Sequence, residues 1–171
     1  MKCVARIETG DGVFSAVFND NGLTELSFPD RACRVQSTAD VPKKWETATA
    51  AALKCVLRGE QPDGLPPLDL SKGTPFQQKV WRALLEIPAG ETRSYGEIAA
   101  AVGEPGAARA VGAACGANPI PVLVPCHRVL AAHKKLGGFS AGLKWKRLLL
   151  EREARRAGIR FELPIRDSVA A

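Results

Sequence analysis

The sequence of 171 residues predicts an α+β fold: a small N-terminal domain of antiparallel strands and a helix over residues 1–72, then a helical, winged-helix-like domain over residues 73–171. Three observations predict it. Apolar and polar residues alternate over the first 28 residues, prolines cluster between residues 61 and 71, and two helix-start signals open the second half. Strands before the prolines and short helices after them indicate the α+β class.

Short strands and one helix make up the predicted first domain. Residues 10–12 and 19–22, rich in Gly, Asp and Asn, divide the alternating region, so we expect two or three antiparallel strands. Pro42–Arg58 is rich in Ala, Lys, Glu and Leu, and Gly59 follows its end, as is common for a helix. The proline-rich residues 61–71 predict a connection.

The second half opens with three predicted helices. Thr74-Pro75-Phe76-Gln77 combines a capping residue with a first-turn proline and starts a helix that ends before Pro88. Ser94-Tyr95-Gly96-Glu97 is a second capping box and starts a short helix that stops at Gly103. A third helix is expected over Ala107–Cys115. Two short helices joined by a glycine-containing turn are typical of a helix-turn-helix.

The third helix carries one long polar side chain. Arg109 stands among alanine, glycine and valine, whereas reading a major groove takes several long polar side chains. Small residues allow close backbone approach to a narrow groove, and one arginine can intrude where a base has been displaced. A tight helix–helix contact would use the same small residues, so the helix alone leaves both interpretations open.

Pro125-Cys126-His127-Arg128-Val129 follows an apolar run, Ile120–Val124, which we interpret as a buried extended segment. A cysteine in such a place is often a small hydrophobic residue. His127 and Arg128, however, are costly to bury without partners, and nearby positive charge lowers the pKa of a thiol. The pentapeptide therefore predicts a sheltered, activated nucleophile.

The last strong helix is expected from about residue 143 to residue 157. Glu151 follows Leu148 by three residues and could share its inward side. Pairing with Arg147 or Arg155 on the surface is the alternative. Residues 163–171 show no regular pattern.

Charge is unevenly distributed along the chain. Residues 1–73 carry nine basic and ten acidic side chains, residues 74–171 carry fifteen and eight, and the whole chain has a net charge of +6. A basic second half favours a polyanionic partner, although a solvated helix face over Lys144–Arg160 would give the same excess.

Cysteine usage and the lack of long apolar stretches indicate the compartment. The five cysteines form no Cys-x-x-Cys pair, which argues against a disulfide framework or a metal knuckle and favours a reducing environment. No stretch approaches about 18 uncharged apolar residues, and no apolar leader follows Met1. We expect a soluble cytoplasmic protein that is neither secreted nor membrane-bound.

The pentapeptide at 125–129, the Gly-Ala-Asn-Pro-Ile-Pro of residues 116–121 and the Gly-Gly-Phe-Ser of residues 137–140 together resemble the O6-alkylguanine-DNA alkyltransferases, also called methylated-DNA–protein-cysteine methyltransferases. The likeness covers about residues 73–157 and includes both capping boxes in family order. It implies DNA repair by direct damage reversal. The alkyl group of O6-alkylguanine in DNA, with O4-alkylthymine as a further candidate, would pass irreversibly to the protein, once per molecule.

The resemblance also implies catalytic roles. Cys126 would accept the alkyl group, and His127 would take the thiol proton through a water. Glu151 would orient the imidazole, and Tyr95 would protonate the departing guanine as general acid.

Further residues match the family's DNA contacts. Arg109 would enter from the minor groove and fill the gap left by the flipped base, on a helix whose small residues Ala108, Ala110 and Gly112 approach the DNA. Asn118 would be a hinge between the helix-turn-helix and the active-site segment. The base pocket would be formed by Tyr95, the Val129 carbonyl, the Ser140 amide and Phe139.

Two departures from the family pattern leave the range of alkyl groups open. Phe139 stands where many members have tyrosine, and Ala141 lies where residues vary with tolerance for bulky groups. The resemblance implies no cofactor. We expect no zinc site, because the histidines are confined to His127 and His133. The expected partner is double-stranded DNA containing O6-alkylguanine, bound by a monomer in the cytoplasm, or in the nucleus of a eukaryote.

Other classes fit part of the pattern. A cysteine hydrolase would use Cys, His and a carboxylate, but it needs an oxyanion hole, and adjacent Cys and His residues are an unusual geometry for direct proton transfer. A non-catalytic lesion-binding relative would lack the acceptor cysteine. A winged-helix regulator would need more long side chains on its third helix.

Overall fold

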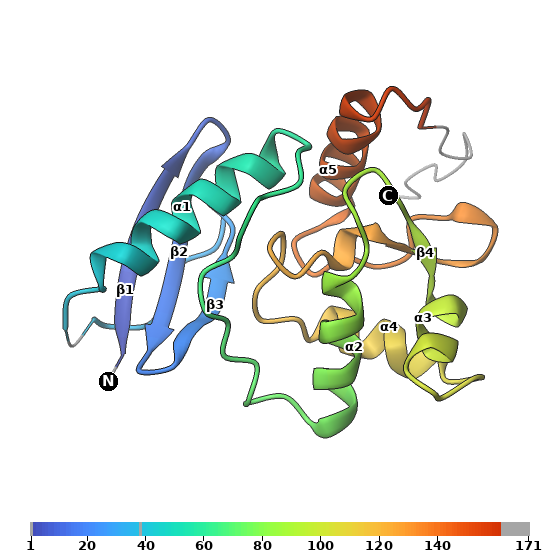
Figure 1. Cartoon of the computed structure of the whole chain (residues 1–171), viewed down its shortest axis with the longest axis horizontal. Helices are drawn as coiled ribbons and strands as arrows, with labels where there is room; N and C mark the ends of the chain where they lie inside the picture. Colours follow the sequence, from blue (N-terminus) through green and yellow to red (C-terminus); the bar gives the residue numbers. More distant parts are fainter. Residues whose placement is uncertain (1, 38, 162–171) are drawn as a thin grey trace.

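In the computed structural model, which describes residues 2–37 and 39–161, the N-terminal half is a three-stranded antiparallel sheet covered by a helix (Figure 1). Strands β1 (Cys3–Thr9), β2 (Gly12–Asn19) and β3 (Gly22–Ser27) pair in sequence order. Alternate residues of β1 are buried, and helix α1 (Lys43–Leu57) turns its apolar side to the core. This arrangement confirms the predicted strands and helix.

The proline-rich connection runs beside the sheet. The Leu23 amide of β3 donates to the Pro67 carbonyl at 2.8 Å, and the Asp69 amide donates to the Leu23 carbonyl at 2.8 Å. Leu68 thereby forms a parallel bridge with Leu23. The connection thus leads the chain along the edge of β3 toward the second half.

Four helices dominate the second half as far as residue 161, and each begins within one residue of its predicted start. They are α2 (Pro75–Leu85), α3 (Tyr95–Ala101), α4 (Ala108–Gly116) and α5 (Leu143–Arg156). Both predicted capping boxes are present, at Thr74 and Ser94. Helices α2, α3 and α4 pack together, and Trp81 Nε1 donates to the Ala114 carbonyl at 2.8 Å, which fixes α4 against α2.

A small parallel sheet connects the helix-turn-helix to the cysteine segment. Strand β4 (Arg93–Ser94) pairs with β5 (Val129–Leu130), and a 3-10 turn, Cys126–Arg128, directly precedes β5. A second 3-10 turn, Ala132–Lys134, follows it. The pairing places Tyr95, the first residue of α3, beside the segment that carries Cys126.

The apolar run Ile120–Val124 is buried, but the prediction of an extended segment was wrong. The Val124 amide donates to the Ile120 carbonyl at 2.9 Å, and Val122 has a φ of 74°, so the chain turns. The Asn118 side chain holds this turn: it accepts from the Ile120 amide at 3.0 Å and donates to the Val124 carbonyl at 2.8 Å. Burial of an apolar run is compatible with either conformation, and the asparagine decides between them.

One hydrophobic cluster runs through both halves, from Cys3 in β1 to Leu149 in α5. Because the two halves share this cluster, the domain boundary near residue 72 stays a prediction. Residues 163–171 lie outside the described residues.

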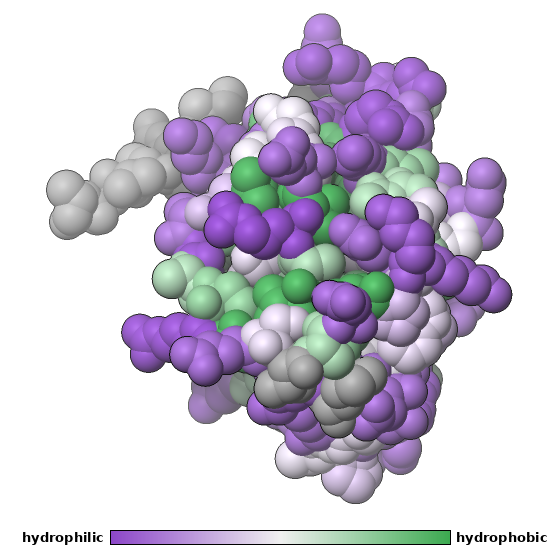
Figure 2. All heavy atoms as spheres, turned by 90° about the vertical axis from the view of Figure 1, so that its left-hand side faces the viewer, coloured by the Kyte–Doolittle hydropathy of each residue, from purple (hydrophilic) through white to green (hydrophobic). Residues whose placement is uncertain are grey.

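The face on the left of Figure 1 is mostly hydrophilic around a narrow hydrophobic band (Figure 2). Among the described helices, none is both long and apolar enough to cross a membrane.

Gly59 sets the distance between the end of α1 and helix α5. Its φ is 79°, and a Cβ there would lie 2.4 Å from the Arg152 carbonyl oxygen and 2.8 Å from the Glu153 amide nitrogen. We expect Gly59→Ala to lower the free energy of unfolding by about 2 kcal/mol or more, since both the backbone conformation and the contact are unfavourable. Urea denaturation measures it. Gly64→Ala, where a Cβ meets nothing within 4 Å, is the control, and an equal effect of both changes would contradict this interpretation.

Candidate active site

Cys126 lies in the 3-10 turn between the Asn118-held turn and β5. Its side chain is buried, with 4% of the residue exposed, as are His127 at 0% and Arg128 at 2%. The sequence prediction that these polar residues are sheltered is therefore confirmed. Their burial requires partners, and those partners define the site.

The carboxylate that contacts His127 is Glu153, not Glu151 as the sequence analysis expected. Glu153 Oε1 lies 2.8 Å from His127 Nε2, whereas Glu151 is exposed. The buried residues of α5 are Lys146, Leu149, Leu150, Glu153 and Ala154. Their spacing is that of one helix face. Lys146 and Glu153 both lie on this buried face, so the pattern of apolar residues alone indicated the wrong side of the helix as the side that faces the core.

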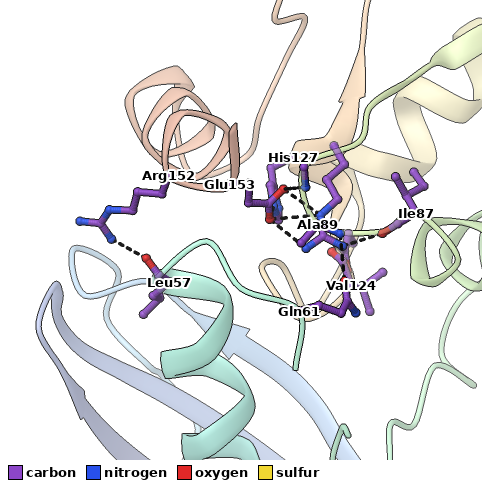
Figure 3. Close-up of polar contacts among 11 residues, drawn as sticks. Leu57, Gln61, Ile87, Ala89, Val124, His127, Arg152 and Glu153 are labelled. Carbon is purple, nitrogen blue, oxygen red and sulfur yellow. Dashed lines mark hydrogen bonds and ion pairs between the residues drawn. The ribbon is translucent and has the colours of Figure 1, made fainter. Parts of the chain in front are cut away.

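Arg128 completes a buried ionic network around Glu153. Its Nε lies 3.1 and 3.0 Å from the two carboxylate oxygens, its Nη2 donates to Oε1 at 2.8 Å, and its Nη1 donates to the Ile87 carbonyl at 2.6 Å. The Gly90 amide also donates to Glu153, at 3.3 Å. Figure 3 shows Glu153 pointing toward His127, while its neighbour Arg152 points away toward Leu57. Two consecutive residues of α5 thus bind different halves of the molecule: Arg152 contacts the N-terminal half and Glu153 the C-terminal half.

The charges of this network follow from its geometry. Burial would raise the pKa of Glu153, but the hydrogen bonds and charges of His127 and Arg128 outweigh it and lower the pKa to about 2. Burial lowers the pKa of His127 below its usual value, against the opposing effect of Glu153. Glu153 is therefore ionised and paired with Arg128, and His127 is neutral.

The tautomer of His127 follows from this assignment. A carboxylate can only accept hydrogen bonds, so Nε2 carries the proton that is donated to Glu153, and Nδ1 keeps its lone pair. Within the described residues, Nδ1 is buried and has no hydrogen-bond partner. The site therefore holds a neutral imidazole with one free acceptor, which is what a general base requires.

The thiol of Cys126 is held by Asn118 and lies near Lys146. Asn118 Nδ2 donates to Sγ at 3.1 Å. Burial raises the pKa of Cys126, and the Asn118 hydrogen bond and the Lys146 charge only partly oppose it. The expectation that neighbouring positive charge would give a low pKa was wrong, because Arg128 points to Glu153 and desolvation dominates. The resting thiol is protonated.

Lys146 is a buried cation that the sequence analysis missed. Its Nζ donates to the Val129 carbonyl at 2.6 Å and to the Gly138 carbonyl at 3.3 Å, and it lies 5.9 Å from the centroid of the Tyr95 ring. Burial lowers its pKa to about 8. No sequence signal separated it from the other basic residues of α5.

Tyr95 is a half-buried phenol facing the loop after β5. Burial raises its pKa to about 12, so the phenol keeps its proton. Gly137, with a φ of 67°, lies so close that a Cβ there would be 2.8 Å from the Tyr95 oxygen. Glycine is required at this point for the loop to pass the phenol.

A pocket of about 340 Å³ opens beside Cys126 between α4 and this loop. It brings together six of the predicted site residues: Tyr95, Ala108, Arg109, Gly112, Cys126 and Phe139. It also includes Cys115, Gly116 and Gly138, which the sequence analysis did not single out. Ala110 is exposed on α4 outside the pocket lining, and Ser140 lines a neighbouring cleft with Asn118.

Across residues 2–37 and 39–161, no three His, Cys, Asp or Glu side chains are placed to hold a metal ion together. The pocket and its surroundings bring together a thiol, a neutral imidazole, a phenol and a buried ammonium.

The helix-turn-helix defines a DNA-binding fold. Its second helix lines a pocket with a buried thiol and a phenol, and an imidazole–carboxylate pair lies beside that thiol. The family model described as 6-O-methylguanine DNA methyltransferase, DNA binding domain, matches residues 75–155. The methylated-DNA–protein-cysteine methyltransferase of Mycolicibacterium paratuberculosis is 44% identical over 151 residues, 87% of this chain and 90% of that protein. The chain belongs to the methylated-DNA–protein-cysteine methyltransferase family.

Other relatives agree with this assignment. The Mycobacterium tuberculosis protein is 58% identical over 105 residues, which is 61% of this chain and spans 63% of that relative's length. The crystal structure of M. tuberculosis OGT in complex with DNA has a TM-score of 0.76 and 44% identity, and the match covers 90% of this chain and 93% of that one. The α+β fold predicted from the sequence is thus confirmed.

Removing the charge of Glu153 tests the corrected assignment. Glu153→Gln leaves the buried Arg128 without its counter-ion, so we expect the free energy of unfolding to fall by roughly 3–5 kcal/mol. Glu151→Gln is the matched control on the same helix, and an exposed change of this kind should stay within about 0.5 kcal/mol. Urea denaturation at pH 7 measures both. A larger loss in the Glu151 variant would restore the original assignment.

The stability of the protein should depend on pH through the same carboxylate. The pKa of Glu153 is about 2 in the folded protein and 4.5 in its unperturbed state. A depressed carboxyl pKa contributes stability above pH 4.5 and loses it as the pH falls toward 2. We expect the wild type to lose about 3 kcal/mol more than Glu153→Gln across this window. Urea denaturation at several pH values measures the difference. If the free energy of unfolding falls in parallel with pH for the wild type and Glu153→Gln, the result contradicts this prediction.

Proposed function

We propose that this protein repairs DNA by direct damage reversal: Cys126 takes the alkyl group from O6-alkylguanine and keeps it, so that each molecule acts once. The observation that carries this proposal is the Cys126 thiol at a pocket lined by Arg109 and Tyr95, with the buried His127–Glu153 pair beside it. Membership of the family and the similarity to a structure of a relative bound to DNA support it.

Activation of the thiol would begin at His127. The thiol proton would pass, through a water, to the free Nδ1 of the neutral imidazole, and Glu153 would stabilise the imidazolium that forms. Glu153 thus takes the orienting role that the sequence analysis gave to Glu151. Asn118, which donates to the sulfur at 3.1 Å, and the nearby Lys146 ammonium would favour the thiolate as it develops.

The transfer itself is a displacement at the alkyl carbon. The sulfur forms a bond to that carbon, the bond between the carbon and the guanine O6 breaks, and the departing base takes a proton. Tyr95, whose pKa of about 12 keeps it protonated, is the proposed donor. The resulting thioether is stable, so each molecule would complete a single turnover.

DNA recognition would use helix α4. Arg109 is exposed on α4 and lines the pocket, and Ala108 and Gly112 beside it leave room for close approach of the duplex. We propose that Arg109 enters from the minor groove and replaces the flipped base, with Ala110 along the same surface. Phe139, the Val129 carbonyl and the Ser140 amide would contact the flipped base, and Asn118 would act as the hinge.

The setting of the reaction follows from its substrate. The partner would be double-stranded DNA that contains O6-alkylguanine, bound by a monomer through the basic second half of the chain. We propose that the protein acts inside the cell, where its DNA substrate lies.

The decisive experiment is the intact mass of the protein after incubation with a duplex that contains one O6-methylguanine, followed by peptide mapping. We expect a gain of one methyl group on Cys126. Cys126→Ser should gain none, while Cys115→Ser, the matched change of the other buried pocket cysteine, should still be modified at Cys126. Salt-sensitive binding without any gain in mass would indicate a lesion-binding protein instead, and turnover of esters would indicate a hydrolase.

A further inference from the structure

The loop Leu136–Gly142 forms one wall of the Cys126 pocket through Gly138 and Phe139. Three of its seven residues are glycines, and Gly137 and Gly142 have φ values of 67° and 98°. Glycine-rich backbone has high conformational freedom, so such a loop needs contacts from outside to hold one geometry.

One side of the loop is held by the C-terminal half. Lys146 of α5 donates to the Gly138 carbonyl at 3.3 Å, and Tyr95 lies against Gly137. Both contacts act on the first half of the loop. Residues Phe139 and Ser140, which would meet the base, lie beyond them.

The other side of the loop is held by the segment that follows β3. The Phe28 ring meets the Phe139 ring edge-on, with centroids 6.0 Å apart, and Arg31 Nη2 donates to the Ser140 carbonyl. Phe28 is itself fixed, since its ring lies 5.4 Å from Phe14 and 4.8 Å from Trp145. A rigid N-terminal core therefore reaches the part of the loop that the C-terminal contacts leave free.

The end of β3, directly before this segment, is bound to the turn that holds the thiol. The Leu26 amide donates to the Pro119 carbonyl at 2.9 Å. Phe28 and Arg31 line a cleft of about 200 Å³ together with Asn118 and Ser140. The end of β3 and the residues directly after it thus contact both the turn that supports Cys126 and the wall of the base pocket.

We propose that Phe28 and Arg31 are positioning residues for alkyl transfer, which hold the loop so that Phe139 and the Ser140 amide face the base. This inference rests on the proposed function and assigns a role to the N-terminal half. The hydrogen bond from the Gly142 amide to the Phe139 carbonyl, at 2.9 Å, closes a turn around Ser140. Arg31 holds the Ser140 carbonyl within that turn, and so restricts the orientation of the adjoining peptides.

Arg31 offers the sharper test, because it is exposed and its loss leaves the core intact. Arg31→Ala removes the contact, and Arg31→Lys keeps a donor of the same charge. Arg34→Ala is the matched control, since Arg34 is an exposed arginine of the same segment with no hydrogen bond or ion pair within the described residues. Arg31→Ala and Arg34→Ala each remove one positive charge from the same segment, so their nonspecific attraction to DNA is matched.

Two measurements decide the proposal. At saturating duplex containing O6-methylguanine, the first-order transfer rate of Arg31→Ala should be about tenfold lower than that of Arg34→Ala, with Arg31→Lys intermediate, because small misplacements of a substrate site are costly. Without DNA, amide hydrogen exchange in residues 136–142 should be faster in Arg31→Ala alone, at unchanged melting temperature.

Equal rates and equal exchange in the two alanine variants would overturn the proposal. A loss of duplex affinity with an unchanged saturated rate would also overturn it and make Arg31 a phosphate contact. If the wild type transfers no alkyl group, the proposed function fails, and the exchange measurement still decides whether Arg31 holds the loop.

Discussion

The buried carboxylate of Glu153 is the interaction on which the rest of the site depends. It neutralises Arg128 and fixes the tautomer of His127, and it accepts a hydrogen bond from the Gly90 amide in the turn after α2. Removing two charges from water is costly, so such a pair persists only with many well-aligned hydrogen bonds. The turn that carries Cys126 is thereby held against α5 by directional contacts rather than by apolar packing alone, and the position of the thiol follows from them.

Local signals predicted the framework because they act over a few residues. The two capping boxes at Thr74 and Ser94 and the glycine- and aspartate-rich turns between the strands have local causes, and each of them is found where the sequence indicated. Cys126 and His127 were recognisable because charged neighbours in an apolar run require an explanation. Their surroundings were not, since Glu153 and Lys146 come from a helix face whose phase is set by tertiary contacts.

The errors share one physical origin. Glu151 was chosen from an apolar pattern that two buried charges interrupt, and the Ile120–Val124 turn was hidden because its hydrogen bonds come from the Asn118 side chain. A low pKa of the Cys126 thiol was expected from its neighbours in the sequence. The pKa depends instead on burial and on distances in space, and the Arg128 guanidinium is paired with Glu153 rather than with the thiol. A single sequence does not show which distant residues contact one another. The contacts of Phe28 and Arg31 with the loop Leu136–Gly142 are of this kind.

The burial of Cys126 has a consequence for how long the protein stays usable. A thiol that reacts once cannot be regenerated by the chemistry proposed here, so every encounter with a stray oxidant or free alkylating compound would waste a molecule. Such reactions proceed through the thiolate, and the raised pKa keeps that form scarce in the absence of DNA. The same desolvation that makes the nucleophile harder to activate thus preserves it, and reserves its reactivity for an electrophile that fits the pocket.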